Sequence, residues 1–356
     1  MPIETPDVLV VGLGPAGGRA AAIAAAAGLH VIALERRRGV GAPVQCAEFV
    51  PAPIARDVAD VRAVTAQAVA RMRSFVGEQA PQVTADFRGF MIDRAAFDRM
   101  LVQQAARDGA ECRSGEAVLS IEPDGTVRTS VGAWLQPWVL IGADGPRSKV
   151  GAAIGQQNRD LVDTRQVSVP LVLPHDATDI FLNAEYYGGY GWLFPKGAVA
   201  NVGLGVAMKA RRLLRPMLAA LCGKLERQRR IGNRTLALTG GAIPVGGRLR
   251  SVGCLGRVAV LLAGDAAGLT NPVTGAGIAS AVQSGALAGR AAVDLIGGRS
   301  QALDDYEEEL GDLFDAALNR ALKHRRQVLT GYAGGGRPDA RALSEGWIAS
   351  PHYWAA

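Results

Sequence analysis

A glycine-rich turn near the amino terminus constrains the fold of this chain more than any other feature. Residues 7–11 form a short apolar run that reads as a buried strand, and the turn follows it directly. Gly12, Gly14 and Gly17 make up the turn, which opens into an Ala-rich stretch with the composition of a helix. A second apolar run, 31–34, completes a βαβ unit. The sequence therefore predicts a parallel sheet whose first strand ends at a ligand-binding turn.

Each glycine of the turn has a physical role in binding a pyrophosphate. Gly12 permits the tight turn, Gly14 lets the ligand approach the backbone, and Gly17 lets helix and strand pack closely. The helix start offers unpaired N–H groups and a positive dipole to phosphate. Glu35 ends the next strand, 18 positions after Gly17, and is predicted to accept hydrogen bonds from ribose hydroxyls. The contacts predicted for this half of a dinucleotide are Gly12, Gly14, Pro15, Ala16, Gly17, Glu35 and Arg36.

A second glycine-rich element far downstream extends the predicted ligand. The stretch 261–278 reads LLAGDAAGLTNPVTGAGI, which is an apolar strand, an acidic turn, a loop with proline and glycine, and the start of a small-residue helix. An acid at a strand end and a second helix start suit the ribitol and phosphate of FAD, whereas NAD does not need this second clamp. FAD is therefore the predicted cofactor, with further contacts at Gly264, Asp265, Pro272, Gly275, Gly277 and Ile278.

Charge and composition bear on the other partners of the chain. A formal net charge of +6 favours an anionic ligand, substrate or surface. Nucleic acid is not expected, because no stripe of Lys and Arg alternates with aromatic residues. The four cysteines form no CxxC pair and the four histidines show no ligand spacing, so no metal site is predicted. Neither GxSxG nor a P-loop sequence is present, which argues against the commonest hydrolases and NTPases.

The distribution of charge also gives an expectation for localisation. Residues 1–7 include Glu4 and Asp7 and differ from the basic, then apolar, layout of a signal peptide, so a cytoplasmic protein is expected. No apolar run reaches the length of a bilayer span without a glycine or a charge. A basic stretch, 209–230, carries leucines on one face and is a candidate for peripheral contact with an anionic membrane. Solvated charge on an ordinary surface helix explains the same stretch more simply.

Aromatic residues, only 5% of the chain, gather near position 190. They lie in a β-rich block, 166–250, between two strands that each run into a turn with Gly and Asp. If a hairpin turns at residues 196–197, the alternation of a strand places Tyr190, Trp192 and Phe194 on one face. The block therefore interrupts the nucleotide-binding domain and brings an aromatic face with it.

The predicted register sets these aromatic residues opposite small ones. A two-residue loop would place Tyr190 opposite Gly203 and Trp192 opposite Asn201. Aromatic rings facing glycine form a flat apolar slot, in which each buried CH₂ of a hydrocarbon substrate contributes about 0.8 kcal/mol. The alternative is that this face is packed core between the inserted sheet and the nucleotide-binding domain.

The predicted fold class is α/β, with a Rossmann-like FAD-binding domain and an inserted antiparallel β-sheet domain that binds the substrate. The FAD-binding domain is predicted to be discontinuous, because strands of the βαβ type lie on both sides of the β-rich block. Its segments are 1–72, 94–165 and 252–300; the substrate-binding domain comprises 73–93 and 166–251; a C-terminal helical segment and tail follows over 301–356.

Three segments resemble the para-hydroxybenzoate hydroxylase-like flavoproteins. They are the GxGxxG turn with Glu35, the IGADGPRSKV stretch with Asp144 and Gly145, and the GDAAG stretch with Asp265. Arg94, in MIDRAAFD, occupies the place where this superfamily has an arginine near the flavin. The resemblance covers most of the chain and implies the same overall fold.

Two further features resemble the geranylgeranyl reductase family within that superfamily. Residues 190–205 match its YxWxFP(x7)GxG substrate motif, and Cys46 in PVQCAEFV occupies the place of a cysteine beside the flavin. The loop 272–278 lacks the His that follows GDAA in the hydroxylases and also lacks their PP pair. These differences make a monooxygenase activity the less favoured of the two. The resemblance implies cofactor contacts at Cys46, Ala47, Arg94, Ala117 and Asp144, and substrate contacts at Tyr190, Trp192, Phe194, Pro195 and Gly203.

The expected function is therefore FAD-dependent reduction of isoprenoid C=C bonds in a prenyl lipid, a prenyl quinone or the side chain of a pigment. Cys46 is the candidate catalytic residue, tuning the flavin or relaying a proton, unless it is simply a small buried residue. NAD(P)H or another reductant is the expected electron donor. A flavin monooxygenase acting on an apolar or aromatic substrate is the alternative, and a non-enzymatic flavoprotein on a membrane surface ranks third.

Overall fold

A computed structural model describes residues 3–355 and confirms the predicted α/β fold class. Its first body is a six-stranded sheet in the order β19-β20-β12-β1-β2-β8, in which every neighbouring pair is parallel except β19 with β20. β1 and β12 are buried along their whole length, as parallel strands between two layers are. The strands are β1 (Val8–Val11), β2 (Val31–Glu35), β8 (Glu111–Ser114), β12 (Val139–Gly142), β19 (Val252–Leu255) and β20 (Val258–Leu262).

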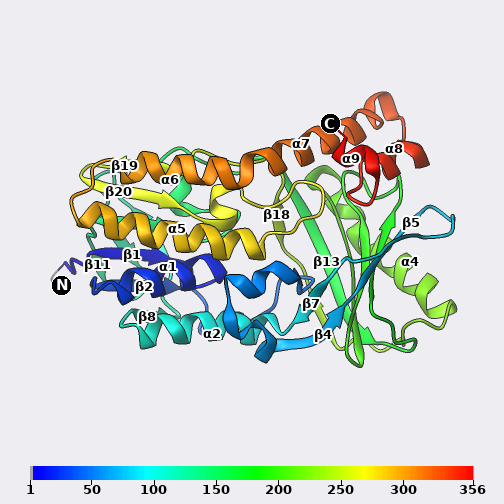
Figure 1. Cartoon of the computed structure of the whole chain (residues 1–356), viewed down its shortest axis with the longest axis horizontal. Helices are drawn as coiled ribbons and strands as arrows, with labels where there is room; N and C mark the ends of the chain where they lie inside the picture. The colour runs from blue at the N-terminus through cyan, green and yellow to red at the C-terminus, as the bar shows by residue number, and fades with distance from the viewer. Residues whose placement is uncertain (1–2, 356) are drawn as a thin grey trace.

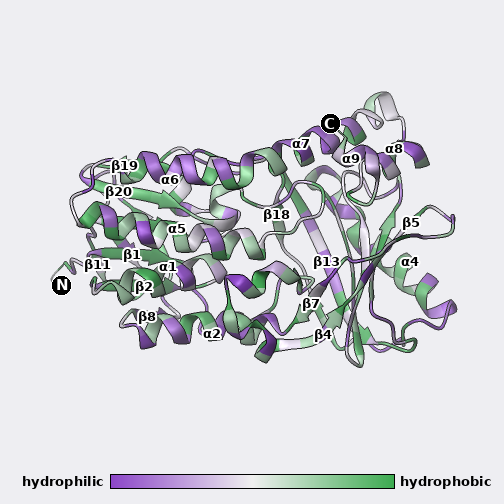
Figure 2. Cartoon of the chain, in the orientation of Figure 1, coloured by the Kyte–Doolittle hydropathy of each residue, from purple (hydrophilic) through white to green (hydrophobic). Residues whose placement is uncertain are grey.

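Helices rich in small residues pack against this sheet (Figure 1). They are α1 (Pro15–Ala26), α2 (Arg94–Arg107), α3 (Lys149–Ala153) and α5 (Ile278–Ile296). α1 and α5 approach closely because Gly285 and Gly289 face α1, where a Cβ atom would lie 2.2 Å from the Ala16 oxygen and 2.8 Å from the Ala20 oxygen. Figure 2 shows the apolar strands β1, β2 and β20 in green beneath these helices. The small residues of α1 and α5 thus allow these two helices to pack closely behind the glycine turn.

Two three-stranded sheets complete the nucleotide-binding body. One, ordered β11-β10-β9, contributes Val118, Val127 and Leu135 to the main core. The other, ordered β3-β7-β4, lies next to the two short 3₁₀ helices η1 and η2. The elements are β3 (Phe49–Pro51), η1 (Ala52–Arg56), η2 (Ala59–Val64), β4 (Thr65–Val69), β7 (Gly89–Ile92), β9 (Val118–Ile121), β10 (Val127–Thr129) and β11 (Trp134–Leu135).

The inserted β-rich block forms an eight-stranded sheet in the order β17-β13-β16-β15-β14-β5-β6, with β18 also paired to β13. Its pairs are antiparallel except β5 with β14, which run parallel. Helix α4 (Leu214–Arg227) covers one face with four buried leucines. The strands are β5 (Arg71–Val76), β6 (Gln82–Thr84), β13 (Leu161–Pro170), β14 (Ala177–Leu182), β15 (Gly191–Lys196), β16 (Val199–Ala207), β17 (Ala237–Thr239) and β18 (Ala242–Pro244).

The turn between β15 and β16 differs from the predicted one by one position. Lys196 pairs with Val199, so the two turn residues are Gly197 and Ala198, whereas residues 196–197 were expected. Gly197 adopts a φ of 65°, a left-handed conformation that a tight hairpin turn needs and that glycine adopts without steric cost. Gly197 occupies the first of the two turn positions, and this sets the register between β15 and β16.

The predicted cross-strand partners of the aromatic residues are consequently wrong. Trp192 lies opposite Gly203, not Asn201. Tyr190 accepts a hydrogen bond from the Gly205 amide at 3.0 Å, and so lies opposite that glycine and not Gly203. Because the slip is two positions along β16, the alternation of faces is unchanged and the aromatic residues stay on one side of the sheet.

The basic stretch expected as one helix over 209–230 consists of two elements. It begins as a 3₁₀ helix, η3 (Met208–Leu213), and continues as α4. Pro216 lies in the first turn of α4, where its missing N–H is tolerated, and this fixes the start of the α-helix near residue 214.

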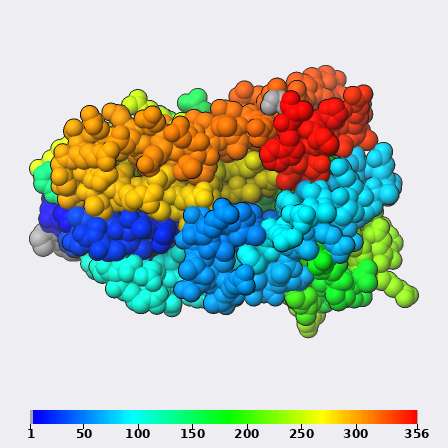
Figure 3. Space-filling model, in the orientation of Figure 1, coloured from blue at the N-terminus to red at the C-terminus, as the bar shows by residue number. Residues whose placement is uncertain are grey.

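The C-terminal helices span both bodies. α6 (Ala302–Leu310), a π-type turn and α7 (Ala316–Thr330) form one long rod, which runs from the six-stranded sheet to the eight-stranded one in Figure 1. After it, α8 (Ala340–Glu345) and α9 (Pro351–Trp354) fold back, and Figure 3 shows this red segment against the light-blue surface of the segment that contains β5 and β6. Within residues 3–355, no helix combines the length and the apolar character that a bilayer crossing requires.

The predicted domain borders remain a prediction. The border after residue 72 falls inside β5, and the border after residue 165 falls inside β13. Both strands are paired within the eight-stranded sheet from their first residues, Arg71 and Leu161, so a border inside each strand divides one continuous element.

Candidate functional site

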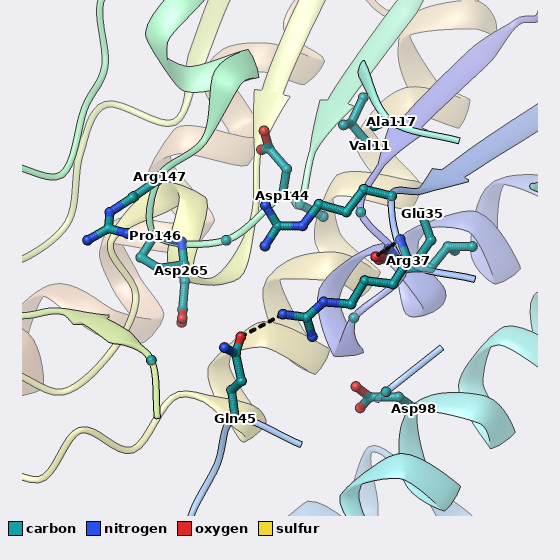
Figure 4. Close-up of a pocket in the computed structure, with 18 of the residues that line it drawn as sticks. Val11, Glu35, Arg37, Gln45, Asp98, Ala117, Asp144, Pro146, Arg147 and Asp265 are labelled. Carbon is teal, nitrogen blue, oxygen red and sulfur yellow. Dashed lines mark hydrogen bonds between the residues drawn. The ribbon is translucent and has the colours of Figure 1, made fainter. Parts of the chain in front are cut away.

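A cleft of about 820 Å³ opens at the carboxyl ends of the parallel strands, against the edge of the eight-stranded sheet. In an α/β sheet this is where ligands bind. Figure 4 shows Glu35 and Arg37 on one side of the cleft, with Asp144 and Asp265 across from them. Eight predicted cofactor contacts line it, namely Gly12, Gly14, Glu35, Arg36, Arg94, Ala117, Asp144 and Asp265. Lining residues that the sequence did not predict include Arg37, Gln45, Asp98, Arg147 and Asp163.

The remaining predicted cofactor contacts lie behind or beside the cleft. Residues 15–17 form the first turn of α1, and Gly264 directly precedes Asp265. Cys46 and Ala47 follow Gln45 on the loop that closes one side of the cleft. The loop 272–277 lies outside the lining, next to the aromatic residues, where Val273 packs and Thr274 accepts a hydrogen bond from Tyr190. Ile278, the first residue of α5, also lies outside the lining and packs against the apolar cluster that contains Val50 and Phe97.

The glycine turn leaves open space only where a ligand would need it. Gly12 has a φ of 96°, a conformation that disfavours any side chain. A Cβ atom on Gly17 would lie 1.7 Å from the Gly12 oxygen, so that position serves packing. A Cβ atom on Gly14 would meet no protein atom within 4 Å. Since Gly14 lines the cleft at the start of α1, this open space fits a pyrophosphate beside the helix N-terminus.

The Glu35 carboxylate is held rigidly at the end of β2. Its two oxygens accept hydrogen bonds from the backbone amides of Leu13, at 3.2 Å, and Arg37, at 2.9 Å. The Arg37 side chain then donates to Gln45 at 2.9 Å and to the Pro43 carbonyl at 3.2 Å (Figure 4). Arg37 thereby joins the ribose side of the cleft to the loop that carries Cys46. The basic run Arg36–Arg38 was visible in the sequence, but nothing in it singled out Arg37.

Two half-buried aspartates, Asp144 and Asp265, lie at the opposite side of the cleft. Asp144 accepts from the Ser148 hydroxyl at 2.5 Å and the Lys149 amide at 2.6 Å. Asp265 accepts from the Thr270 hydroxyl at 2.7 Å. Burial raises the pKa of both carboxyl groups above their usual value, although these hydrogen bonds oppose the shift. A ligand that brings hydroxyl donors, such as the ribitol of FAD, matches carboxyl groups in this environment.

Cys46 lies close to the guanidinium of Arg94, which lines the cleft. Arg94 donates to both oxygens of Asp98, at 2.6 and 3.1 Å. The Cys46 sulfur accepts from the Glu48 amide at 3.2 Å. Burial raises the pKa of the Cys46 thiol above its usual 9.0, and the nearby Arg94 charge only partly offsets this. The thiol therefore keeps its proton at neutral pH.

Glu48 is a site residue that the sequence did not predict. It is buried, with a φ of 72°, and accepts hydrogen bonds from Lys196 at 2.8 Å, Asn201 at 2.8 Å and the Arg94 amide at 3.0 Å. These donors come from β15, β16 and the start of α2. One carboxylate thus fixes the Cys46 loop to the aromatic hairpin. The only sequence signal was an acid two positions after the cysteine.

The aromatic strand is bonded to both loops beside the cleft. The Trp192 indole donates to Gln166 at 2.9 Å, and Gln166 donates in turn to the Cys46 carbonyl at 3.0 Å. The Tyr190 hydroxyl donates to the Thr274 carbonyl, at 2.5 Å, in the loop 272–277. The predicted substrate strand and the predicted flavin loops are therefore one connected structure.

The aromatic face is packed rather than open. Trp192 and Phe194 are only 6% and 7% exposed, and Pro195 is buried beside them. The Trp192 ring covers Gly203, where a Cβ atom would lie 2.4 Å from it, so the indole itself fills the predicted slot. Trp347, from the C-terminal segment, packs against Tyr190 with ring centroids 4.9 Å apart. In this structure the aromatic face is therefore packed core, which was the alternative to an open substrate slot.

Comparison with known proteins bears on the family. A model of the geranylgeranyl reductase catalytic domain matches residues 164–242, which include the aromatic hairpin. The digeranylgeranylglycerophospholipid reductase of Methanosarcina acetivorans is 31% identical over 324 residues, covering 85% of this chain and 78% of the relative. That of Methanocella arvoryzae is 31% identical over 348 residues, covering 90% and 87%.

Solved structures agree with this relationship. A geranylgeranyl bacteriochlorophyll reductase-like protein of Thermoplasma acidophilum has a TM-score of 0.84 at 27% identity and covers 96% of this chain and 90% of its own. PqsL of Pseudomonas aeruginosa, a probable FAD-dependent monooxygenase, has a TM-score of 0.72 at 17% identity over 96% of this chain and 99% of its own, a likeness that shows the fold alone. The cleft, the two glycine-rich segments and these relatives lead to one conclusion: the chain belongs to the geranylgeranyl reductase family of FAD-dependent oxidoreductases.

Proposed function

We propose that this chain reduces isoprenoid C=C bonds of a prenyl lipid, with digeranylgeranylglycerophospholipids as the substrate class. The relatives from Methanosarcina acetivorans and Methanocella arvoryzae are named digeranylgeranylglycerophospholipid reductases. The observation that carries the proposal is the hydrogen-bonded link from Trp192 through Gln166 to Cys46, which places an aromatic apolar wall next to a protonated thiol. A prenyl quinone or a pigment side chain has the same reacting group and differs only in its head.

Cys46 is the proposed proton donor in this reaction. Bound FAD in its reduced form supplies a hydride to one carbon of the double bond. The Cys46 thiol gives its proton to the other carbon, so the bond gains two hydrogens and no oxygen. The Arg94 guanidinium lowers the pKa of the thiol against the effect of burial and so stabilises the thiolate that remains.

The aromatic strand is proposed to hold the prenyl chain by burial. Tyr190, Trp192, Phe194, Pro195 and Gly203 would line its path. Each buried CH₂ contributes about 0.8 kcal/mol, so several isoprene units bind without directional contacts. The same burial keeps water away from the reduced cofactor. Because Trp347 covers Tyr190 in this structure, the C-terminal segment has to move aside when the chain binds.

The electron donor is proposed to be NAD(P)H or another reductant that binds only transiently. The chain contains a single GxGxxG turn, and the FAD assignment uses it. A donor without a permanent dinucleotide site must approach the cofactor through the open side of the cleft.

Product analysis tests this function. The purified protein, a digeranylgeranylglycerophospholipid and a chemical reductant are incubated without O₂, and the lipid is analysed by mass spectrometry. Reduction predicts a gain of two hydrogens for each double bond. Turnover that requires O₂ and adds one oxygen would instead establish a monooxygenase, and no change in any apolar substrate would refute an enzymatic role.

A matched pair of cysteine variants tests the proton donor. Cys46→Ala should slow the reduction step by at least about 100-fold, the usual contribution of a positioned general acid. Cys46→Ser keeps a hydroxyl at the site and should retain part of the rate. Cys254→Ala, at an exposed cysteine, is the control and should react at the wild-type rate. Unchanged rates in Cys46→Ala would show that the proton comes from another group.

A further inference from the structure

A second hollow, of about 440 Å³, lies beside the cleft at the edge of the eight-stranded sheet. Residues of β13, η3, the start of α4 and the end of β17 enclose it. It shares Asp163 and Gly240 with the lining of the cleft, so the two spaces are neighbours. Its lining comprises Asp163, Thr164, Arg165, Arg211, Arg212, Leu214, Leu238, Thr239 and Gly240.

Three arginines give this hollow a positive charge that the protein does not neutralise. Arg165, Arg211 and Arg212 form no ion pair or side-chain hydrogen bond with any residue from 3 to 355. Other arginines of the same body are paired, as Arg230 is with Asp179. Asp163 is the one acid in the lining, so three positive charges against one negative leave a net charge of +2. Unpaired cations gathered in a concavity favour an anionic ligand.

Exposed leucines lie in or next to the segments that line the same hollow: Leu238 lines it, and Leu213 and Leu236 lie one and two residues from the lining residues Leu214 and Leu238. Leu213, Leu236 and Leu238 are 51%, 43% and 59% exposed, although most leucines of this body are buried. Leu238 belongs to β17, the edge strand of the sheet, and Leu236 directly precedes that strand. Exposed leucines around a basic hollow match a bilayer surface, where leucine enters the lipid boundary and arginine meets phosphate.

We propose that this hollow binds the phosphate of a glycerophospholipid head group presented by a bilayer, and that it seats the protein on the membrane surface. The proposal goes beyond the reductase function, because docking of a head group requires neither bound flavin nor a reducible chain. It assigns the peripheral membrane contact to η3 and the β17 edge, and not to the whole basic stretch 209–230.

The position of the hollow connects docking to the catalytic cleft. The Gln45 side chain donates to the Gly240 carbonyl at 2.8 Å, and the Thr239 hydroxyl donates to the Val44 carbonyl. Thr239 and Gly240 line the hollow, whereas Val44 and Gln45 line the cleft directly before Cys46. A lipid held by its phosphate in the hollow therefore lies next to the loop that carries the proposed proton donor.

Vesicle sedimentation tests the proposal. The full-length holoprotein is mixed with vesicles of phosphatidylcholine alone or with added phosphatidylglycerol. Wild type should sediment with the anionic vesicles only. The variant Arg165→Gln/Arg211→Gln/Arg212→Gln should lose roughly 100-fold in partitioning, since each cation at an anionic surface contributes about fivefold. Leu213→Ser/Leu238→Ser should also weaken binding while leaving the net charge unchanged.

The control variant is Arg56→Gln/Arg62→Gln/Arg107→Gln, which removes the same charge from exposed positions outside the hollow. It should bind as wild type does, and all variants should keep their flavin and their circular dichroism. Equal losses in both triple variants would reduce the effect to net charge and overturn the proposal. Binding of soluble glycerol 3-phosphate to the hollow without vesicle binding would overturn it as well, because the site would then serve a free phosphate compound. The assay reads membrane binding only, so a failed reductase assay leaves its outcome intact.

Discussion

Gly14 and Gly17 belong to the same turn, yet an added methyl group has a different fate at each. At Gly17 it would lie 1.7 Å from the Gly12 oxygen, inside the packed contact between α1 and β1. At Gly14 it would meet no protein atom within 4 Å and would enter the part of the cleft where we propose that the cofactor phosphates bind. We therefore expect Gly17 to be needed for folding and Gly14 for binding.

This difference predicts separable effects. Gly14→Val should fold normally, because the extended backbone at this position accepts a β-branched residue. Its affinity for FAD should fall by about 100-fold, equivalent to about 3 kcal/mol. Gly17→Val should instead prevent stable folding. Thermal unfolding of the apoprotein and titration with FAD measure the two effects, and wild-type FAD affinity in Gly14→Val would contradict the placement of the pyrophosphate.

Some site residues could be predicted from the sequence alone, and others could not. The glycines, Glu35 and Asp265 follow from local order alone, since a strand, a turn and a helix start are contiguous in the chain. Glu48 does not, because its role depends on a left-handed backbone and on donors from Lys196 and Asn201, which only the folded hairpin brings near. Contacts between distant segments leave no local pattern.

The hairpin of β15 and β16 depends on small residues at defined positions. Alternation correctly placed the aromatic residues on one face, because that depends only on strand period. The register depended on which residue begins the turn, and a slip of two positions leaves the faces unchanged. The sequence therefore predicted that the aromatic residues share one face of the sheet, but it did not predict their partners on β16.

The observed register makes Gly203→Ala a sharp test of this element. The new Cβ atom would lie 2.4 Å from the Trp192 ring and 2.8 Å from the Arg165 carbonyl, so the indole has to move. The free energy of unfolding should fall by about 1–3 kcal/mol, as for other overpacked sites. Loss of the bond from Trp192 to Gln166 should also shift the tryptophan fluorescence and slow the reaction.

Gly223→Ala is the control for this prediction. Gly223 lies in α4, where a Cβ atom would approach only the end of the Arg227 side chain, at 3.4 Å. Alanine favours helix, so stability should be unchanged or slightly higher. If Gly203→Ala proved as stable and as active as this control, the packing of Trp192 over Gly203 would be wrong.

The nucleotide-binding body and the eight-stranded sheet are joined by contacts between residues far apart in the sequence, which composition does not reveal. The C-terminal segment crosses back to place Trp347 on Tyr190, although little chain follows α7. Arg325 of α7 donates to the Gly188 carbonyl, at 2.6 Å, in the turn before β15. These contacts make the tail part of the wall around the proposed prenyl site.

A buried charge cluster in the eight-stranded sheet predicts acid sensitivity of the whole fold. Burial, with repulsion from Arg73 and Arg230, lowers the pKa of His175 to about 4, against 6.5 for an ordinary histidine. The unfolded chain therefore binds more protons than the folded one between these values, and stability falls as pH decreases from 6.5 towards 4. Allowing for the partial exposure of His175, we expect a loss of about 1–2 kcal/mol.

Urea unfolding at pH 7 and pH 5 measures this loss. His175→Gln should flatten the dependence of the unfolding free energy on pH, because it removes the group whose protonation differs between the two states. His352→Gln, at a histidine with 67% side-chain exposure, should leave the wild-type dependence in place. A wild-type slope in His175→Gln would assign the acid sensitivity to other groups.

We propose that a flavin held in this cleft passes hydride to a prenyl chain on the aromatic strand. Rapid mixing tests it most directly: the protein is reduced without O₂, mixed with a digeranylgeranylglycerophospholipid, and followed by flavin absorbance. The absorbance of oxidised flavin should return in a single turnover, in proportion to the double bonds lost. Flavin that stays reduced with the lipid and reoxidises only when O₂ is admitted would show that no hydride passes to the prenyl chain.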